Sequence, residues 1–142
     1  MKRKPMRMAA ADRTSAQLRQ RLMLVEDDDL VRGALEILLG DQYDVDAAAS
    51  AEEAMERFVG GRYDLLITDL RLPGHHGDQL ARAVRGVDPH LPTMLITGED
   101  LLPDDARLVG FDAWLQKPFF DLDQVIGRVE NLLEVSRLRR AG

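Results

Sequence analysis

Short apolar runs and longer amphipathic segments alternate along the chain from residue 22 onward. Residues 22–25 form a continuous apolar run, and residues 65–68 and 93–97 combine apolar residues with threonine; short segments of this kind are typical of strands buried on both faces of a sheet. Between them, apolar residues recur three or four positions apart, as over residues 30–39, which indicates amphipathic helices. This alternation predicts an α/β domain whose parallel sheet is covered on both faces.

The remaining segments complete five predicted strand–helix units. Weaker strands are predicted at residues 111–116 and at residues 43–48, where Asp44 and Asp46 alternate with apolar residues and suit an edge of the sheet. The further helices are predicted over residues 51–60, 78–85, 99–109 and 122–140. We expect a doubly wound, five-stranded parallel sheet of strand order 2-1-3-4-5.

Local signals mark the ends of several elements. Ser50 and Glu53 have the spacing of a capping box at the start of one helix. Asp28 or Asp29 is expected to cap the first helix. Pro103 lies within the helical segment that precedes the last strand, where it would either remove an interior hydrogen bond or occupy the first turn of a helix that starts near Leu102. In both cases we expect this helix to be short.

Charge is divided unevenly along the chain. The first 21 residues hold seven of the 19 lysines and arginines but one of the 25 acidic residues, so the remainder carries a net charge of −12 within a total of −6. We interpret residues 1–19 as a flexible basic leader and residues 20–140 as one domain. An acidic domain of this kind is not expected to bind nucleic acid.

The composition limits the remaining functions. The absence of cysteine excludes disulfides, thiolate metal sites and a thiol nucleophile. No apolar run reaches the roughly 18 residues that would indicate a membrane span. The basic N-terminal residues lack the apolar stretch of a signal peptide, and we expect a cytoplasmic protein.

Polar residues gather at the carboxyl ends of the predicted strands, where ligands bind to open parallel sheets. Glu26 and Asp27 follow the first strand, and Asp69 ends the third. The fourth strand ends at Thr97 and the fifth at Lys117. Because the first and third strands are neighbours in the expected order, these carboxylates should face each other across one mouth.

This set of side chains suits phosphoryl transfer. Closely packed carboxylates repel each other, and Lys117 together with Mg²⁺, which binds carboxylate and phosphate oxygens, would supply the opposing charge. An aspartate carboxylate can act as a nucleophile toward phosphorus. The lysine, the metal ion and the Thr97 hydroxyl would each stabilise charge on the transferred group.

Three motifs resemble those of the receiver domain of bacterial two-component response regulators. They are LVEDDDLVR at residues 24–32, YDLLITDLRLPGHHG at residues 63–77, and MLITG at residues 94–98 followed by DAWLQKPF at residues 112–119. Their order and spacing match the family over about residues 20–135. The resemblance implies the flavodoxin-like receiver fold.

The resemblance also implies a metal site around a phosphoacceptor. Asp69 corresponds to the phosphoacceptor of the family, and Asp27 corresponds to a direct Mg²⁺ ligand. Glu26 corresponds to its partner, which acts through water. Arg71 occupies the position that offers a backbone carbonyl to the metal.

A second group of residues corresponds to the phosphate-binding and switch positions. Thr97 resembles the switch hydroxyl and Lys117 the phosphate-binding lysine. Trp114 occupies the position of the switch aromatic, where Tyr or Phe is commoner, and a role as a packed core residue remains an equal alternative. Pro118 matches a Lys-Pro bond that is often cis in the family.

The implied function is that of a signalling domain rather than an enzyme with a substrate to turn over. A histidine kinase or a histidine phosphotransfer protein would donate the phosphoryl group, and the domain would catalyse only its own phosphorylation and dephosphorylation. The altered domain would then bind a downstream protein or form a homodimer. No output domain follows residue 140, so we expect a stand-alone receiver.

Several residues near the predicted site receive more ordinary interpretations. Arg71 and Glu99 lie two residues after Asp69 and Thr97, and they could pair over the site and slow the attack of water, although such an exposed pair would be weak. His75 and His76 are expected to be surface loop residues rather than metal ligands. Phe120, like its neighbour in sequence, is expected to pack under the last helix.

Three alternatives remain beside the leading interpretation. In the first alternative, the chain would be a receiver-like scaffold that takes no phosphate. In the second, it would be the N-terminal receiver part of a longer regulator. A phosphatase of the haloacid dehalogenase kind would need an aspartate two residues after the nucleophile. That position is Arg71, which argues against this enzyme class.

Overall fold

The computed structural model describes residues 19–142. The predicted basic leader therefore lies, except for Arg19, outside the described residues. Arg19 itself is bound to the domain, because its guanidinium donates to the carbonyl oxygens of Gly40 and Tyr43 at 2.8 and 3.0 Å. The fold thus includes this arginine, one residue before the predicted start of the domain.

Five parallel strands form one sheet of order β2-β1-β3-β4-β5, which confirms the predicted topology. They are β1 (Arg21–Val25), β2 (Asp44–Ala48), β3 (Leu65–Asp69), β4 (Thr93–Thr97) and β5 (Ala113–Gln116). β3 and β4 are buried throughout, as their mainly apolar sequences predict, whereas β2 is half-buried and forms an edge.

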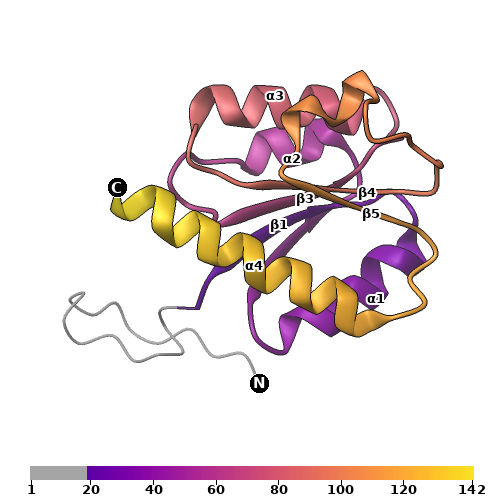
Figure 1. The fold of residues 1–142 in the computed structure, drawn as a ribbon, viewed down its shortest axis with the longest axis horizontal. Coiled ribbons are helices and arrows are strands. Elements are labelled where there is room, and N and C mark those ends of the chain that lie inside the picture. The colour runs from indigo at the N-terminus through magenta and orange to yellow at the C-terminus, as the bar shows by residue number, and fades with distance from the viewer. Residues whose placement is uncertain (1–18) are drawn as a thin grey trace.

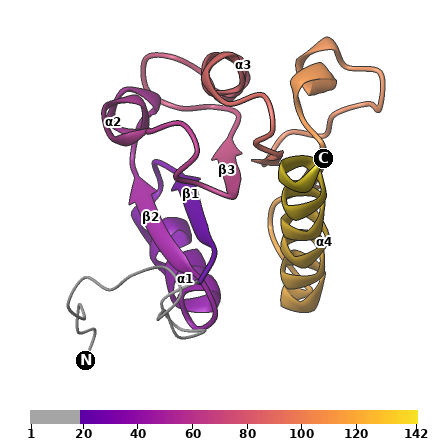
Figure 2. The ribbon, with the colours of Figure 1, turned by 90° about the vertical axis from the view of Figure 1, so that its left-hand side faces the viewer.

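Two helices cover each face of the sheet (Figures 1 and 2). α1 (Asp29–Gly40) and α4 (Leu122–Ala141) pack on one face, and α2 (Ala51–Arg57) and α3 (Gly77–Val87) pack on the other. Successive residues of β1 serve the two layers in turn, because side chains alternate along a strand: Leu24 joins the α1/α4 layer and Met23 the α2/α3 layer. Among residues 19–142, no helix combines the length and apolar character needed to cross a membrane.

The connection between β4 and β5 departs from the prediction. In place of a helix over residues 99–109, the described chain has only the short 3₁₀-helix η3 (Ala106–Gly110). Pro103 lacks an N–H and disfavours helical geometry at the preceding residue. The carboxylate of Asp105 then accepts the N–H of Arg107, so that helical structure begins at residue 106.

Two other boundaries also differ from the prediction. α2 ends at Arg57 rather than near residue 60, because Phe58 adopts an extended backbone and its ring stacks on Tyr63 with centroids 5.8 Å apart. β5 begins at Ala113 rather than at residue 111. Phe111 instead closes η3, its N–H donating to the carbonyl oxygen of Leu108.

Aspartate side chains form hydrogen bonds and ion pairs near the amino ends of the strands. The Asp64 carboxylate accepts the N–H of Arg21 at the start of β1, at 2.9 Å. Asp88 is buried, accepts the N–H of Gly61 at 3.1 Å, and forms an ion pair of 2.9 Å with Arg140 in the last turn of α4. Because these carboxylates are matched by N–H groups and arginines, this end of the sheet carries little uncompensated charge.

The amino end of α3 stands directly against the end of β3. A Cβ atom on Gly77 would lie 2.0 Å from the carbonyl oxygen of Asp69, a distance that no side chain can occupy. The Gly77 N–H donates to the carbonyl of Leu70 at 2.9 Å and fixes this approach. Glycine at residue 77 therefore sets the position of the Asp69 backbone.

We predict opposite effects for two alanine substitutions in α3. Gly77→Ala should lower the free energy of unfolding by about 1–3 kcal/mol, because the backbone at Asp69 must move. Gly86→Ala is the matched control: nothing lies within 4 Å of its Cβ position, and alanine should stabilise the helix by roughly 0.5–1 kcal/mol. Urea unfolding of both variants measures the two effects, and a neutral Gly77→Ala would contradict the predicted contact.

We also predict that the Asp88–Arg140 pair stabilises the fold only above acidic pH. Burial alone would raise the pKa of Asp88, but the bonds from Arg140 and from the Gly61 N–H outweigh it and hold the pKa below its ordinary value. Asp88→Asn should therefore cost about 1–3 kcal/mol at neutral pH. Since the native carboxylate is protonated as pH falls through its lowered pKa, this difference should shrink in acid.

Urea unfolding of wild type and Asp88→Asn across pH 3 to 7 tests this expectation. The exposed Asp104→Asn, the same chemical change, is the control and should leave stability almost unchanged. A difference between Asp88→Asn and wild type that stays constant with pH would show that the charge of Asp88 is not what stabilises the fold.

Candidate functional site

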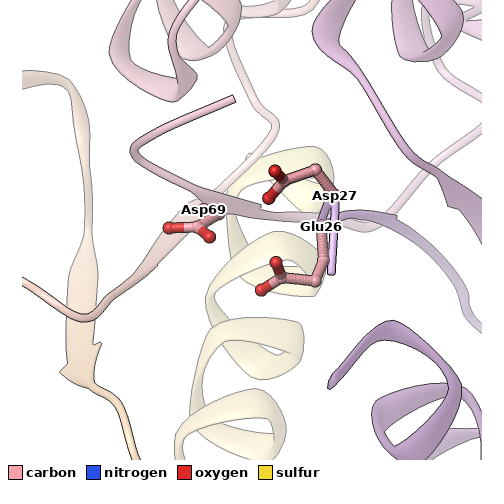
Figure 3. A group of neighbouring side chains, drawn as sticks. All are labelled: Glu26, Asp27 and Asp69. Carbon is pink, nitrogen blue, oxygen red and sulfur yellow. The ribbon is translucent and has the colours of Figure 1, made fainter. Parts of the chain in front are cut away.

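Three carboxylates meet beyond the carboxyl ends of β1 and β3. Glu26 and Asp27 directly follow β1, and Asp69 is the last residue of β3. One oxygen atom from each of the three lies within 4.8 Å of the other two. Figure 3 shows the side chains gathered at one place, as the neighbouring positions of β1 and β3 require.

The three acids differ in burial. Glu26 is fully buried and Asp69 is 6% exposed, whereas Asp27 is exposed to solvent. The turn after β1 is built around Glu26: one carboxylate oxygen accepts the N–H of Asp28 at 3.0 Å, and the backbone carbonyl accepts from Arg32 of α1 at 2.9 Å. The two buried acids are thus held from within the sheet, and Asp27 faces the solvent beside them.

Lys117 joins the two buried carboxylates. Its Nζ atom donates to Glu26 Oε1 at 3.0 Å and to Asp69 Oδ2 at 2.8 Å. Burial raises the pKa of Glu26, which the bonds from Asp28 and Lys117 offset only in part. Burial alone would lower the pKa of Lys117, but its bonds to Asp69 and Glu26 leave that pKa above its ordinary value. The lysine therefore remains charged at neutral pH.

The loop after β5 positions this lysine. The Lys117 N–H donates to the carbonyl oxygen of Thr97 at 2.7 Å, and the peptide bond between Lys117 and Pro118 is cis. Phe119 packs against the core between the sheet and the α1/α4 layer, as expected. The expectation for Phe120 is wrong, because its side chain is 93% exposed: the loop directs one phenylalanine inward and the next outward.

Thr97 and Trp114 lie beside the acidic mouth on β4 and β5. Thr97 is buried, one residue beyond the pairing partner of Asp69 on β4, and its Oγ1 accepts the N–H of Glu99 at 3.0 Å. Trp114 is half-buried and packs against the cluster that contains Leu108 of η3. The indole is therefore part of the contact between β5 and η3.

The pair between Arg71 and Glu99 that their positions allow is present. Arg71, on the loop after β3, donates from Nε to the Glu99 carboxylate, which also accepts from Arg107 of η3 at 3.3 Å. The Arg71 side chain is mostly exposed, so the pair lies at the rim of the site. The effect of this pair on the attack of water stays a prediction.

The other polar residues near the mouth have structural roles. Asp28 is the N-cap of α1 and accepts the N–H groups of Leu30 and Val31 at 2.9 and 3.1 Å. His75 and His76 are both exposed, and His75 pairs with Glu52 of α2. Within residues 19–142, Glu26, Asp27 and Asp69 are the one group of acidic and histidine side chains spaced to hold a metal ion.

The donor set fits Mg²⁺ rather than a softer metal. All three side chains offer carboxylate oxygens, and octahedral Mg²⁺ binds such oxygens at about 2.0–2.1 Å, which places opposite ligands about 4 Å apart. Carboxylate oxygens within 4.8 Å of one another need to move little to reach that geometry. The half-buried Lys117 is bonded to Glu26 and Asp69, and the exposed Asp27 is therefore free to supply a ligand.

Sequence reasoning missed two arginines that shape the site. Arg32 holds the Glu26 carbonyl, and its only signal was its early place in the first helix. Arg107 binds both Glu99 and Asp105, and it lies in a segment predicted as an ordinary helix. Its contacts depend on the path of the loop between β4 and β5, which the sequence pattern does not give.

Comparison with known proteins identifies the family of this arrangement. A family model described as the response regulator receiver domain matches residues 22–130. The regulatory protein VanRB of Enterococcus faecalis is 35% identical over 121 residues, covering 82% of this chain and 53% of VanRB. The chain spans about half the length of the curated relatives it matches.

Solved structures agree with this assignment. The response regulator TrrA of Thermotoga maritima, crystallised in complex with Mg²⁺ and BeF, is similar with a TM-score of 0.72 and 29% identity, covering 80% of this chain and 98% of TrrA. TrrA bound to the histidine kinase ThkA gives a TM-score of 0.71 and 30% identity over the same shares of the two chains. The family model matches well over half of the present chain, which therefore belongs to the response regulator receiver domain family.

Proposed function

We propose that this domain accepts a phosphoryl group on Asp69 from a phosphohistidine of a partner protein. The observation that carries this proposal is the Asp69 carboxylate, which is 6% exposed, bonded to Lys117 and grouped with two further acids. A buried carboxylate with a fixed cation beside it is a nucleophile already in place.

The transfer balances as a substitution at phosphorus. An oxygen of the Asp69 carboxylate forms the new P–O bond while the P–N bond of the phosphohistidine breaks. The histidine nitrogen leaves with the electron pair and is protonated from solvent. Lys117 Nζ, 2.8 Å from Asp69 Oδ2, is placed to stabilise charge on the phosphoryl oxygens.

Glu26, Asp27, Asp69 and the backbone carbonyl of Arg71 are the groups that would hold Mg²⁺. When bound, the ion supplies positive charge to the phosphoryl oxygens. The fully buried Glu26 keeps the donor set in place, since its carboxylate is tied to the turn after β1 and to Lys117. The exposed Asp27 completes the set from the solvent side.

The switch would use Thr97 and Trp114. The Thr97 hydroxyl lies on the strand beside Asp69 and would turn toward a phosphoryl group there, giving up its bond from the Glu99 N–H. Trp114 packs with Leu108 and would respond to a change in η3. Phosphorylation would thus shift the populations of two arrangements of one domain.

The partner that donates the phosphoryl group would be a cytoplasmic histidine kinase or histidine phosphotransfer protein. Support comes from the structural relative TrrA, which was crystallised with the histidine kinase ThkA. Phe120, 93% exposed and three residues after Lys117, together with the exposed Leu30 of α1, offers apolar surface for such a partner near the mouth. A downstream protein or a second copy of this domain would read the switched state.

The phosphatase alternative gains no support, because Arg71 points to Glu99 rather than serving as an acid or base at Asp69. A scaffold that takes no phosphate is also disfavoured. Such a protein would have no need to bury Glu26 and Asp69 around a lysine, which is costly without a function or a compensating gain.

We predict that acetyl phosphate with Mg²⁺ adds one phosphoryl group to the wild-type chain and none to Asp69→Asn. Intact-mass spectrometry measures the addition, and EDTA should abolish it. Asp104→Asn, at an exposed aspartate, is the matched control and should be modified like wild type. Because some receivers take small donors poorly, beryllofluoride binding followed by ¹⁹F NMR is a second measurement. Failure of both would leave the scaffold function.

We further predict that Mg²⁺ stabilises the fold through Asp27. At a concentration 100 times its Kd, the ion should raise the free energy of unfolding by about 2.7 kcal/mol. Asp27→Asn should lose most of that increment. Asp28→Asn should keep it, because asparagine caps a helix as well as aspartate does. Thermal unfolding with and without Mg²⁺ measures the increment, and equal behaviour of the two variants would exclude Asp27 as a ligand.

A further inference from the structure

Glu99 connects three parts of the structure that lie far apart in the sequence. Its carboxylate binds Arg71 of the loop after β3 and Arg107 of η3. Its backbone N–H donates to Thr97 Oγ1 at 3.0 Å. The hydrogen bond from Arg71 holds the pKa of Glu99 below its ordinary value, so the side chain is ionised at neutral pH. One residue thus contacts the acceptor loop, the switch hydroxyl and η3.

η3 packs against α3, but the side chains of its first residues make few polar bonds outside their own turn. Leu108 is the buried residue of this short helix, while Val109 is 84% exposed. Arg107 binds the Asp105 carboxylate at 2.9 Å, which closes a local turn but does not attach that turn to the sheet. The Asp105 N–H donates to the carbonyl oxygen of Leu102 at 3.0 Å within this loop, and the bond of Arg107 to Glu99 ties the first residues of η3 to the end of β4.

The other end of η3 is firmly anchored. The carbonyl oxygen of Gly110 accepts from Arg85 of α3 and from the Thr93 hydroxyl, both at 2.7 Å. A movement of η3 would therefore pivot about Gly110. It would separate Leu108 from the cluster that includes Trp114.

We propose that Glu99 is a latch that keeps η3 closed until Thr97 turns toward a phosphoryl group on Asp69. In the closed state, Thr97 Oγ1 accepts the Glu99 N–H, and the Glu99 carboxylate holds Arg107. When the hydroxyl turns away, the Glu99 backbone loses its partner and the carboxylate can no longer hold Arg107 in the same geometry. η3 then opens about Gly110. This inference rests on the proposed function for the trigger, but not for the latch itself.

The strength of the latch follows from the solvent exposure of the ion pairs that Glu99 makes with Arg71 and Arg107. Side chains of Arg71, Arg107 and Glu99 are 71%, 38% and 28% exposed, so solvent screens their attraction. Releasing such pairs shifts an equilibrium by roughly two- to tenfold rather than by orders of magnitude. The latch is weak enough to be opened by one new hydrogen bond on Thr97.

Amide hydrogen exchange at Leu108 and Phe111 measures the latch directly. Both N–H groups are bonded within the η3 region, to Asp105 and Leu108, and exchange when it opens. Glu99→Gln should raise both exchange rates roughly two- to tenfold in the protein without phosphoryl analogue. The control Glu134→Gln also breaks an exposed acid–arginine pair, on α4, and should change neither rate. Unchanged exchange in Glu99→Gln would overturn the proposal.

Beryllofluoride with Mg²⁺ tests the trigger. In wild type it should raise exchange at Leu108 and the acrylamide quenching of Trp114, the one tryptophan of the chain. In Glu99→Gln it should bind, by ¹⁹F NMR, but add little further opening. Absence of ¹⁹F-detected binding to wild type would count against the phosphoacceptor function alone. Binding that leaves η3 exchange unchanged in wild type would overturn the latch.

Discussion

The bond network of Lys117 is the interaction on which the site depends. Two carboxylates lie almost wholly out of water at the ends of adjacent strands, and such burial is costly unless a cation is bonded to both. The lysine directly follows β5, the far edge strand, so it links residues 91 and 48 positions away in the sequence. β1, β3 and β5 must therefore be aligned before the acids are satisfied, and the geometry of the mouth is a property of the whole sheet.

The sheet could be predicted from the sequence because its three central strands are buried on both faces and consist mainly of apolar residues, while the alternation in β2 marks an edge. The connection before β5 could not, because the helical pattern of residues 99–109 is local, whereas Pro103 and the Asp105 cap decide where helical structure can start. Helix periodicity also overestimated the length of α2, since the periodicity does not reveal that Phe58 stacks on Tyr63.

The acids and the lysine of the site could be located because each ends a strand, and parallel strands end at one edge. The contacts of residues that lie on loops could not be predicted in this way. The contact between Arg71 and Glu99 was found from their equal offsets from two strand ends, but Arg107 reaches Glu99 only because the chain turns back through η3. The same limit explains Phe120, whose outward direction depends on the backbone of a single loop.

The contrast between the two ends of the sheet has a kinetic consequence. Aspartates at the amino ends are matched by arginines and N–H groups, whereas at the other end Lys117 is bonded to Glu26 and Asp69 and leaves Asp27 aside. Until a divalent cation binds, a donor that carries a phosphoryl group meets a negative potential there, and repulsion reduces its rate of association before any contact forms. Added salt shortens the range of that repulsion, to about 10 Å at 0.1 M ionic strength. Encounter with an anionic donor should thus become faster as ionic strength rises, the opposite of the usual behaviour of oppositely charged partners.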